Sequence, residues 1–507
     1  MQVLENAAPP SFFLNGRPLP PIIQGGMGIA VSGWRLARAV AMAGHIGIVS
    51  GTGIDLVLVR ELQNGDPNGR LRVLADYPDQ EYVAWLRATY YVEGGKAEGA
   101  PYKLLPIHKF SPTLRSQQVL AAAAYSEIRL AKEGHDGLVG MNLLAKIKRH
   151  TLGALVGTIL ADADLVVMGA GIPIEEAEAL RLLADGRPAR LRIDVDVPDG
   201  VENTGPFYYN LDPNAVVPGY APRRAPAFFP IVSSDALASI LEKKITPGAF
   251  AGFVVEHHTA GGHNAPPRNK RVDADQNPVY DARDEANLAR IAALGYPFYV
   301  AGGYGTPEAL RRAWAHGAVG VQVGSLFSLC NESGYPEADK RHLIRSIHTG
   351  AAIIRTDGRA SPTGFPFKVV EVAGTLGIPE AQAERTRICD LGYLQGAYLD
   401  AKGKMQGRCA SEPVDDYVRK GGAVEDTVRR ACLCNGLAAN IGLGQVQKWG
   451  EEQTFFTGGD DLVNLPLASA EHPHYSAQDV IDHLMAEPMP AEVSGDGATQ
   501  DAAPPVA

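Results

Sequence analysis

Two short apolar runs near residues 300 and 320 each end in glycine where a helix is predicted to begin. The first run leads into Gly302 and Gly303, and the second leads into Gly324 and Ser325. Glycine lets a ligand approach the backbone, and N–H groups at a helix start attract phosphate. One such turn would indicate only a tight loop, whereas two in succession are typical of the last strand–loop units of a (β/α)8 barrel. The pair therefore predicts a cofactor-phosphate site on a barrel.

Apolar runs rich in Val, Ile and Ala alternate with helix-like segments through the first two thirds of the chain. We predict eight strands, at residues 21–24, 46–50, 138–143, 165–169, 228–233, 252–256, 297–301 and 319–323. Helices are predicted at residues 34–43, 174–184, 235–243, 286–293 and 307–316. This alternation favours parallel βαβ units, and eight of them favour a closed barrel over an open sheet. The predicted class is α/β, a (β/α)8 TIM barrel.

The predicted barrel occupies residues 16–345. The remaining segments are an N-terminal tail (1–15), two long insertions (54–125 and 197–226), a mixed, mainly helical C-terminal extension or lid (346–485) and a disordered tail (486–507). The insertions have charged or loop-like sequences, and residues 191–197 could add an edge strand. Loops of this length either cover a site or decorate the periphery. The last segment is rich in Pro, Ala, Gly and acids, which is typical of disorder.

The composition excludes several classes of function. The net charge of −10 and a pI near 5.8 disfavour binding to nucleic acid or to an anionic membrane surface. The sequence has neither a membrane-length apolar run nor a basic start followed by an apolar core, so we expect a cytoplasmic protein. Five cysteines in 507 residues suit a reducing compartment. We expect a small-molecule substrate, and a homo-oligomer is compatible with these features.

Residues at the ends of the first and third predicted strands are candidate ligand contacts. Gln24, Gly25, Gly26 and Met27 end the first strand, where paired glycines would let a flat ligand lie against the backbone. Met27 offers a soft, apolar contact to a ring. Asn142 is a lone polar residue in an apolar strand and needs a partner, either a ligand or a neighbouring loop. A simple tight turn is the alternative explanation for the glycine pair.

The sixth predicted strand ends in Glu256 and leads through Gly261 and Gly262 to His263. Histidine is the side chain best suited to moving protons near neutral pH, although a capping or surface histidine remains an alternative. The neighbouring His257 and His258 match no metal-binding spacing that we recognise. Close by lies a basic cluster, which fits either a solvated loop or a site for an anionic substrate or second cofactor: Arg268, Lys270 and Arg271.

Five motifs along the chain resemble one enzyme family when they are taken in order. They are Ile23-Gln24-Gly25-Gly26-Met27-Gly28, Gly140-Met141-Asn142-Leu143, Ala260-Gly261-Gly262-His263, Ala301-Gly302-Gly303 and Gly320-Val321-Gln322-Val323-Gly324-Ser325. Together, over roughly residues 16–330, they resemble the nitronate monooxygenase (2-nitropropane dioxygenase-like) family of FMN-dependent TIM barrels. That family is also related to flavin-dependent enoyl-acyl-carrier-protein reductases. The ordered set is specific for the superfamily and not for a substrate.

The resemblance implies a role for each matched residue. The implied flavin-ring contacts are Gly25, Gly26 and Met27, with Asn142 at the polar edge and with Gln24 and Glu256 as further cofactor-binding candidates. The implied FMN phosphate contacts are Gly302, Gly303, Gly324 and Ser325, with Gly261 and Gly262 nearby. His263 would be the catalytic, proton-handling residue. The chain departs from many relatives at Thr259, where they carry Glu, and in its His257–His258 pair, its insertions and its C-terminal extension.

Four of the five cysteines, Cys389, Cys409, Cys432 and Cys434, lie within 46 residues of one another. Four thiolates can bind Zn²⁺ or an iron–sulfur cluster, but the usual pair of Cys-x-x-Cys knuckles is absent from the sequence. A redox pair and plain burial are the other interpretations. We therefore include no metal in the predicted site.

The leading functional hypothesis is an FMN-dependent, nitronate monooxygenase-like oxidation of a small carbanion-forming substrate with O2. The runner-up is an FMN- and NAD(P)H-dependent reductase of enoyl thioesters. A binding protein on a degenerate barrel would need the loss of the phosphate turns, which are intact in sequence. A purine-nucleotide dehydrogenase would need a nucleophilic cysteine over the site, and no cysteine precedes Cys330.

Overall fold

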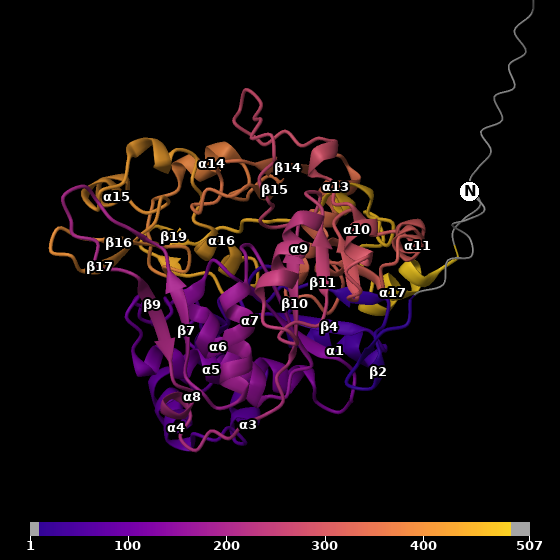
Figure 1. Ribbon diagram of the computed structural model, residues 1–507. Helices are drawn as coiled ribbons and strands as arrows, with labels where there is room; N and C mark the ends of the chain where they lie inside the picture. Colours follow the sequence, from indigo (N-terminus) through magenta and orange to yellow (C-terminus); the bar gives the residue numbers. More distant parts are fainter. Residues whose placement is uncertain (1–9, 488–507) are drawn as a thin grey trace, which may run out of the picture.

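The computed structural model describes residues 10–487, so almost all of the predicted disordered tail lies outside the described residues. Its centre is a closed parallel barrel of eight strands that follow one another in chain order around the ring (Figure 1). These strands are β3 (Ile22–Gln24), β4 (Ile46–Ser50), β5 (Val139–Leu144), β6 (Leu165–Gly169), β10 (Ala227–Val232), β11 (Phe253–Glu256), β12 (Phe298–Ala301) and β13 (Gly320–Val323). The predicted (β/α)8 class is therefore confirmed.

All eight predicted strands are present, and their ends differ from the predicted ends by no more than one residue. The agreement has a physical reason, because strands that are covered on both faces must be apolar almost throughout. The inner faces of the barrel strands form a separate buried cluster that includes Ile23, Val167 and Phe229. Tyr299 closes this cluster, and its hydroxyl donates a 2.8 Å hydrogen bond to the carbonyl oxygen of Pro20.

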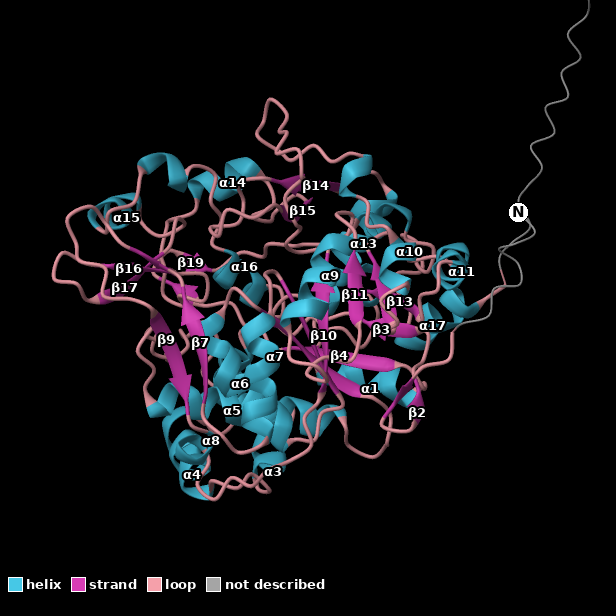
Figure 2. Cartoon of the chain, viewed as in Figure 1, coloured by secondary structure: helices cyan, strands magenta, loops and turns pink. Residues whose placement is uncertain are grey.

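Helices surround the barrel strands (Figure 2). They include α1 (Trp34–Met42), α5 (Leu114–Ala131), α6 (Lys148–Leu160), α7 (Ile174–Ala184), α9 (Asp235–Lys244), α10 (Leu288–Ala292), α11 (Pro307–Ala315) and α12 (Ser325–Ser328). The expected cap of α11 is present, because the side chain of Thr306 accepts the N–H of Ala309 and Pro307 occupies the first turn. Helix α10 begins later than predicted because Asn287 caps it.

The two insertions are more ordered than their sequences indicated. The first contains α2 (Ile54–Gln63), α3 (Arg70–Leu74) and α4 (Gln80–Tyr90), before α5 returns to the barrel. In the second, β9 (Phe207–Leu211) pairs with β7 (Ala189–Ile193) and is followed by α8 (Pro213–Val216). The prediction that residues 197–226 are loop-like is therefore wrong for this part. Within β9 the buried Tyr209 and Leu211 flank the exposed Asn210, an alternation too short to stand out among the surrounding Pro and Gly residues.

The C-terminal extension lies across one side of the molecule, in orange and yellow in Figure 1. Its helices are α13 (Glu337–His348), α14 (Pro379–Glu384), α15 (Val414–Arg419), α16 (Leu433–Ala439) and α17 (Ala477–Met485). Six short strands, which were not predicted, alternate with them: β14 (Ile353–Asp357), β15 (Phe367–Glu371), β16 (Gly396–Leu399), β17 (Met405–Arg408), β18 (Val446–Gln447) and β19 (Gly450–Glu451). Strand β16 also pairs with β8 (Val195–Asp196), which joins the extension to the segment just before the second insertion.

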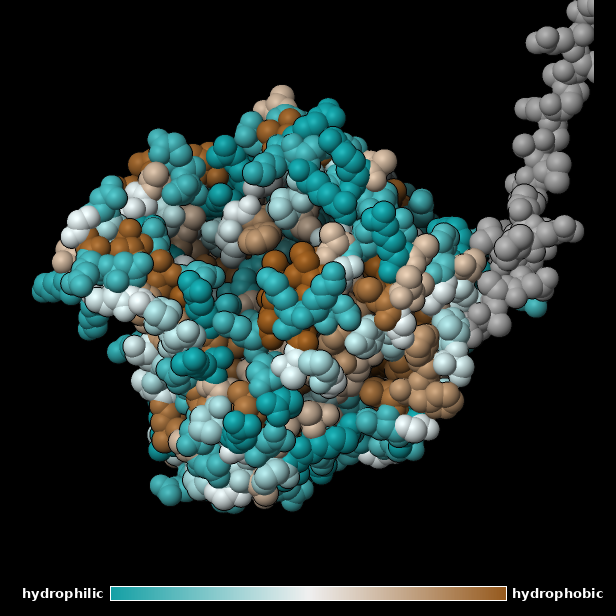
Figure 3. All heavy atoms as spheres, in the orientation of Figure 1, coloured by the Kyte–Doolittle hydropathy of each residue, from teal (hydrophilic) through white to brown (hydrophobic). Residues whose placement is uncertain are grey.

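Hydrophilic side chains cover most of the face shown in Figure 3, and hydrophobic ones form small, scattered groups. In the described part of the chain, no helix combines the length and the apolar character that a membrane crossing requires. Near the N-terminus, before the first barrel strand, β1 (Phe13–Leu14) and β2 (Arg17–Pro18) form a short hairpin.

Candidate active site

Two adjoining cavities lie at the carboxyl ends of the barrel strands, beneath the C-terminal extension. The first, the His263 cavity, is lined by Asn142 and His263 among others. The second, the glycine cavity, is lined by Gly302, Gly324 and Ser325 among others. The residues common to both linings are Gly26, Gly28, Glu256, Gly261, Gly262, Gln322 and Thr457. The carboxyl ends of barrel strands are where ligands bind in this architecture.

Most of the predicted site residues meet at these two cavities. Those that line one or both are Gly25, Gly26, Met27, Asn142, Glu256, Gly261, Gly262, His263, Gly302, Gly324 and Ser325. Gln24 does not, because its side chain is buried in the barrel wall, where Oε1 accepts the N–H of Ile48 at 3.1 Å. Gly303 also stands outside both linings, in the turn beside Gly302.

Close backbone approach explains why two of these positions are glycine. A Cβ atom on Gly26 would lie 2.2 Å from the Cβ atom of Asn142. Gly302 has a φ of +84°, and a Cβ atom there would lie 2.8 Å from the carbonyl oxygen of His257. A side chain at either position would therefore push the strand ends apart or fill the space beside them.

A third glycine turn, residues 457–461 of the extension, covers the two predicted turns. The hydroxyl of Thr457 accepts the N–H of Gly262 at 2.9 Å, and the hydroxyl of Ser325 accepts the N–H of Gly459 at 2.8 Å. The N–H groups of Gly303 and Gly305 face the carboxylate of Asp461, whose pKa is raised by burial. The predicted phosphate turn therefore already faces an anionic side chain.

His263 is held in place by the extension. Its Nε2 atom lies 2.7 Å from the hydroxyl of Ser361, and its ring packs edge-on against Phe367 with centroids 4.8 Å apart. Burial, together with the nearby charge of Lys146, lowers the pKa of His263 well below its usual value. Within the described residues Nδ1 makes no hydrogen bond. His263 is therefore a neutral imidazole with one ring nitrogen free for a ligand.

Two polar side chains that line the cavities, Glu256 and Gln322, lack hydrogen-bond partners among the described residues, and so does Lys146, which lies near His263. Glu256 lines both cavities, and burial raises its pKa to about 8. Gln322 also lines both, and its buried Oε1 has no hydrogen-bond partner among the described residues. Lys146 lies over the ring of Phe365 at 4.2 Å, and burial lowers its pKa to about 7. Buried polar groups of this kind are available to a polar ligand.

The pKa of Glu256 predicts a pH-dependent stability. The folded protein holds a proton up to about pH 8, whereas unfolded Glu256 releases it near its ordinary pKa of 4.5. The stability from this group is therefore fully present below pH 4.5 and is lost as the pH rises through 8, at no more than about 1.4 kcal/mol per pH unit. We expect thermal unfolding of the flavin-free protein to shift downward between about pH 5 and pH 9, and to shift less in Glu256→Gln. Equal shifts in both proteins would contradict the burial of this carboxyl group.

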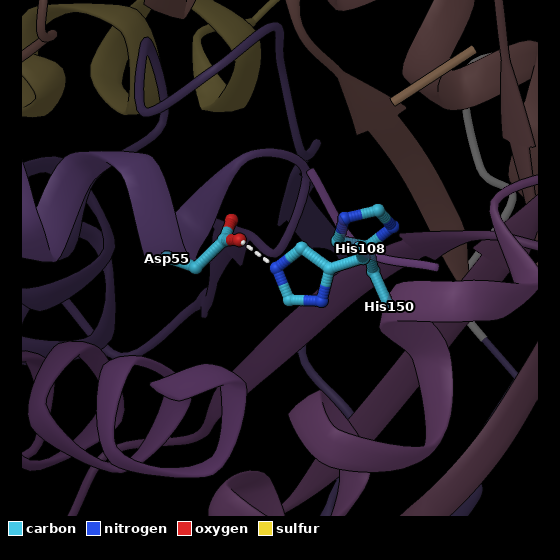
Figure 4. Close-up of side chains that lie close together, drawn as sticks. All are labelled: Asp55, His108 and His150. Atoms are coloured by element: carbon cyan, nitrogen blue, oxygen red, sulfur yellow. Dashed lines mark hydrogen bonds and ion pairs between the residues drawn. The ribbon is translucent and has the colours of Figure 1, made fainter. Parts of the chain in front are cut away.

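Behind the His263 cavity lies a buried cluster of Asp55, His108 and His150 (Figure 4). Asp55 accepts a 2.8 Å hydrogen bond from the hydroxyl of Tyr393, which lines the cavity, and its other oxygen lies 2.8 Å from Nε2 of His108. His108 and these hydrogen bonds lower the pKa of Asp55 to about 2, although burial opposes them. Both carboxylate oxygens of Asp55 are therefore engaged, one with Tyr393 and the other with His108. We infer that the cluster helps to hold Tyr393 in place.

The histidine pair before His263 is engaged elsewhere. His257 lies 2.8 Å from Glu285 through Nε2 and 2.8 Å from the Thr259 hydroxyl through Nδ1. His258 stacks on Tyr280 with centroids 4.0 Å apart. Neither histidine lines either cavity. With Glu285, the two histidines bring possible ligand atoms within 4.8 Å of one another, although both ring nitrogens of His257 are already engaged with Glu285 and Thr259.

Sequence reasoning missed the residues that the extension contributes. Ser361, Thr457 and Tyr393 lie in Gly/Pro-rich segments that carry no periodic signal. The run Thr457-Gly458-Gly459-Asp460 repeats the glycine-pair pattern of the barrel turns and was the one available clue. Gln322 was visible as a polar residue in an apolar strand, the same signal that identified Asn142.

Comparison with known proteins gives one partial match in sequence and several in fold. No protein-family model matches the sequence. Over 129 residues, or 25% of the chain, it is 30% identical to the (3aS,4S,5R,7aS)-5-hydroxy-7a-methyl-1-oxo-octahydro-1H-indene-4-carboxyl-CoA dehydrogenase of Mycobacterium tuberculosis. The match spans about a third (33%) of that relative's length.

Solved structures with a similar fold have low sequence identity. FabK from Thermotoga maritima is 14% identical with a TM-score of 0.46, and the alignment covers 92% of both chains. Nitroalkane oxidase from Streptomyces ansochromogenes is 16% identical with a TM-score of 0.39, covering 92% of this chain and 95% of the other. The enoyl reductase domain of MlnA from Bacillus amyloliquefaciens is 12% identical with a TM-score of 0.45, covering 92% and 93%.

Proposed function

We propose that this protein is an FMN-dependent oxidoreductase. The observation that carries the proposal is the pair of adjoining cavities, one built from glycine turns and the other containing a buried, neutral His263. A flavin nucleotide has the same two parts, a phosphate at one end and a flat ring at the other. FMN supplies the electron-transfer chemistry when it is bound, while the protein orients the substrate and excludes water.

The residues present fit such a cofactor. The backbone N–H groups around Gly302, Gly324 and Ser325 would hold the phosphate. Gly25, Gly26 and Met27 leave a flat surface for the ring, and a side chain at Gly26 would collide with Asn142. The unpartnered Oε1 of Gln322 and the side chain of Asn142 offer polar contacts to the ring edge.

For the reaction itself we propose oxidation of a small carbon acid with O2, with an alkyl nitronate as the reference substrate. A base must be unprotonated to accept a proton, and burial keeps the His263 imidazole neutral at physiological pH. Nδ1 of His263 would take the proton next to the electron-withdrawing group, while Ser361 holds the ring through Nε2. The extension, through Thr457, Ser361 and Tyr393, acts as a fixed cover over the site.

A second candidate is an NAD(P)H-dependent reductase of enoyl thioesters. Two observations favour it. Much of the His263 cavity is lined by apolar side chains, including Ile29, Ile147 and Leu437, which suit an acyl chain better than a small anion. The curated relative of Mycobacterium tuberculosis is named for a CoA thioester substrate.

Two measurements on the purified protein test these proposals. Bound FMN should give absorption maxima near about 370 and 450 nm, and a colourless protein that gains no flavin on incubation with FMN would exclude the cofactor. Anaerobic mixing with NADH or NADPH then separates the candidates. Rapid bleaching of the flavin absorption would favour the thioester reductase. An absorption that neither NADH nor NADPH changes would favour the oxygen-using enzyme.

The carboxylate of Asp461 gives a prediction about cofactor affinity. It faces the N–H groups of Gly303 and Gly305, where the phosphate would bind, so its charge opposes FMN. We expect Asp461→Asn to bind FMN about tenfold more tightly, as measured by fluorescence titration of the flavin-free protein. Riboflavin, which lacks the phosphate, is the control and should bind both proteins equally. Unchanged FMN affinity would place the phosphate elsewhere.

A further inference from the structure

The buried cluster in Figure 4 brings together three side chains from separate parts of the chain. Asp55 lies in the first turn of α2, His108 lies in the loop before α5, and His150 lies in the first turn of α6. Helices α2 and α6 follow the paired barrel strands β4 and β5, so the cluster lies at the carboxyl ends of these strands. Only 0%, 3% and 5% of Asp55, His108 and His150 is exposed.

The hydrogen bonds within the cluster leave several ring nitrogens unused. Both ring nitrogens of His150 are buried and have no partner within the described residues. The same is true of Nδ1 of His108. The ring of His150 packs against His108 and Tyr393, with centroids 4.4 Å and 4.7 Å away, but such packing does not satisfy a polar nitrogen. Burying these nitrogens without partners costs free energy, which a bound ligand would recover.

The positions of the three side chains suit a metal ion. Each residue offers one ligand atom, and these atoms all lie within 4.8 Å of one another. Oδ2 of Asp55 and Nε2 of His108 are already 2.8 Å apart. Nitrogen and oxygen ligands at about 2.0–2.1 Å from a tetrahedral Zn²⁺ lie about 3.3 Å from one another. Side-chain shifts of no more than about 1.5 Å would therefore place all three atoms around one ion.

The backbone that carries these ligands is fixed by buried hydrogen bonds. Arg149 is 4% exposed and donates to the carbonyl oxygens of His108 and Gly392, so it ties two loops to α6. Tyr393, next to Gly392, donates its hydroxyl to Oδ1 of Asp55 at 2.8 Å, which leaves Oδ2 of Asp55 for the cluster. Ligands that are already held in place lose little conformational entropy when an ion binds.

We propose that Asp55, His108 and His150 bind a Zn²⁺ ion. Two imidazoles and one carboxylate form a recurrent ligand set for zinc, with water in the fourth position. The same set can bind Fe²⁺, but a catalytic iron needs open positions that face its substrate. None of the three residues lines the His263 cavity or the glycine cavity, which favours a structural, redox-inert ion. Bonds to the ion would replace the hydrogen bond between Asp55 and His108.

The ion would connect three segments that surround the proposed active site. Asp55 and His108 belong to the first insertion, and His150 belongs to a barrel helix. Through Tyr393, which Asp55 holds and which lines the His263 cavity, the connection reaches the C-terminal extension. Zinc would therefore stabilise the wall of the cavity without contacting a substrate.

The test is a metal analysis of the full-length protein. Bound metals are removed with a chelator, Zn²⁺ is added in excess, and the protein is desalted. We expect about one zinc ion per chain. The zinc-loaded protein should also unfold several degrees above the metal-free protein, because an ion that binds only the folded state stabilises that state.

Neither measurement requires flavin or activity, so a negative result would leave the proposed function standing. A protein that retains no zinc after desalting would overturn the site. Retention of iron in place of zinc when both ions are supplied would overturn the choice of ion.

His150→Phe is the sharpest variant, because Phe keeps the packing against His108 and Tyr393, and His150 makes no hydrogen bond that could be lost. We expect it to lose most of the zinc and to unfold at the same temperature with and without Zn²⁺. His108→Gln gives a second, independent loss of zinc. The control is His257→Gln, which alters the other described group with suitable spacing and should retain the zinc. Full zinc in His150→Phe, or loss of zinc in His257→Gln, would refute the assignment.

Discussion

Replacing His263 by Asn should lower turnover of a neutral nitroalkane by about 10²–10⁴-fold while leaving the flavin content unchanged. The reason is that burial keeps this imidazole unprotonated, and Ser361 holds it through Nε2 so that Nδ1 remains for the substrate. Asn has a similar size near the backbone but cannot accept a proton from carbon. Steady-state oxygen consumption measures the turnover, and the absorption spectrum measures the flavin.

A substrate that is already ionised provides the sharpest comparison. A nitronate anion needs no base, so His263→Asn should retain much of the activity on the nitronate and lose it on the nitroalkane. The matched control variant is His258→Asn. His258 stacks on Tyr280 outside both cavities, so this substitution should leave turnover of both substrates unchanged. Equal losses on both substrates would instead assign His263 a structural role. Full turnover of the nitroalkane by His263→Asn would show that His263 is not the base that removes the proton.

The barrel could be predicted from sequence because its signals are local. A strand covered on both faces is a short apolar run, and a glycine pair at its end marks the turn that follows. Asn142 was found as a lone polar residue within an apolar strand, and Glu256 was named through the family resemblance. Gln24, also named as a cofactor-binding candidate, lines neither cavity, because its amide oxygen accepts the N–H of Ile48 inside the barrel wall.

The rest of the candidate site depends on contacts between distant parts of the chain. Ser361 reaches His263 across 98 positions, Thr457 reaches Gly262 across 195, and Tyr393 reaches Asp55 across 338. The partners lie in irregular segments where neither helix nor strand periodicity constrains the residues. Residue spacing therefore could not decide whether residues 346–485 are a peripheral extension or a lid, and both interpretations were left open.

The glycine turns give the prediction with the largest expected effect on cofactor binding. In Gly302→Ala the new Cβ atom would lie 2.8 Å from the carbonyl oxygen of His257, so the turn must move. We expect the N–H groups of this turn to hold the FMN phosphate. Losing one hydrogen bond to a charged group costs about 1.5–3 kcal/mol, which corresponds to about 10- to 150-fold weaker FMN binding. Fluorescence titration of the flavin-free variant measures this directly.

Backbone strain alone could also disturb the turn, and Gly295→Ala isolates that effect. Gly295 has a φ of +79°, close to that of Gly302, but a Cβ atom there meets nothing within 4 Å. Both variants should lose about 1 kcal/mol of stability from the left-handed conformation, as seen in thermal unfolding of the flavin-free proteins. If the phosphate binds at the Gly302 turn, only Gly302→Ala should also lose FMN affinity. Equal FMN affinity in both variants would mean that the left-handed backbone conformation of the turn, and not its contact with a phosphate, accounts for the glycine at position 302.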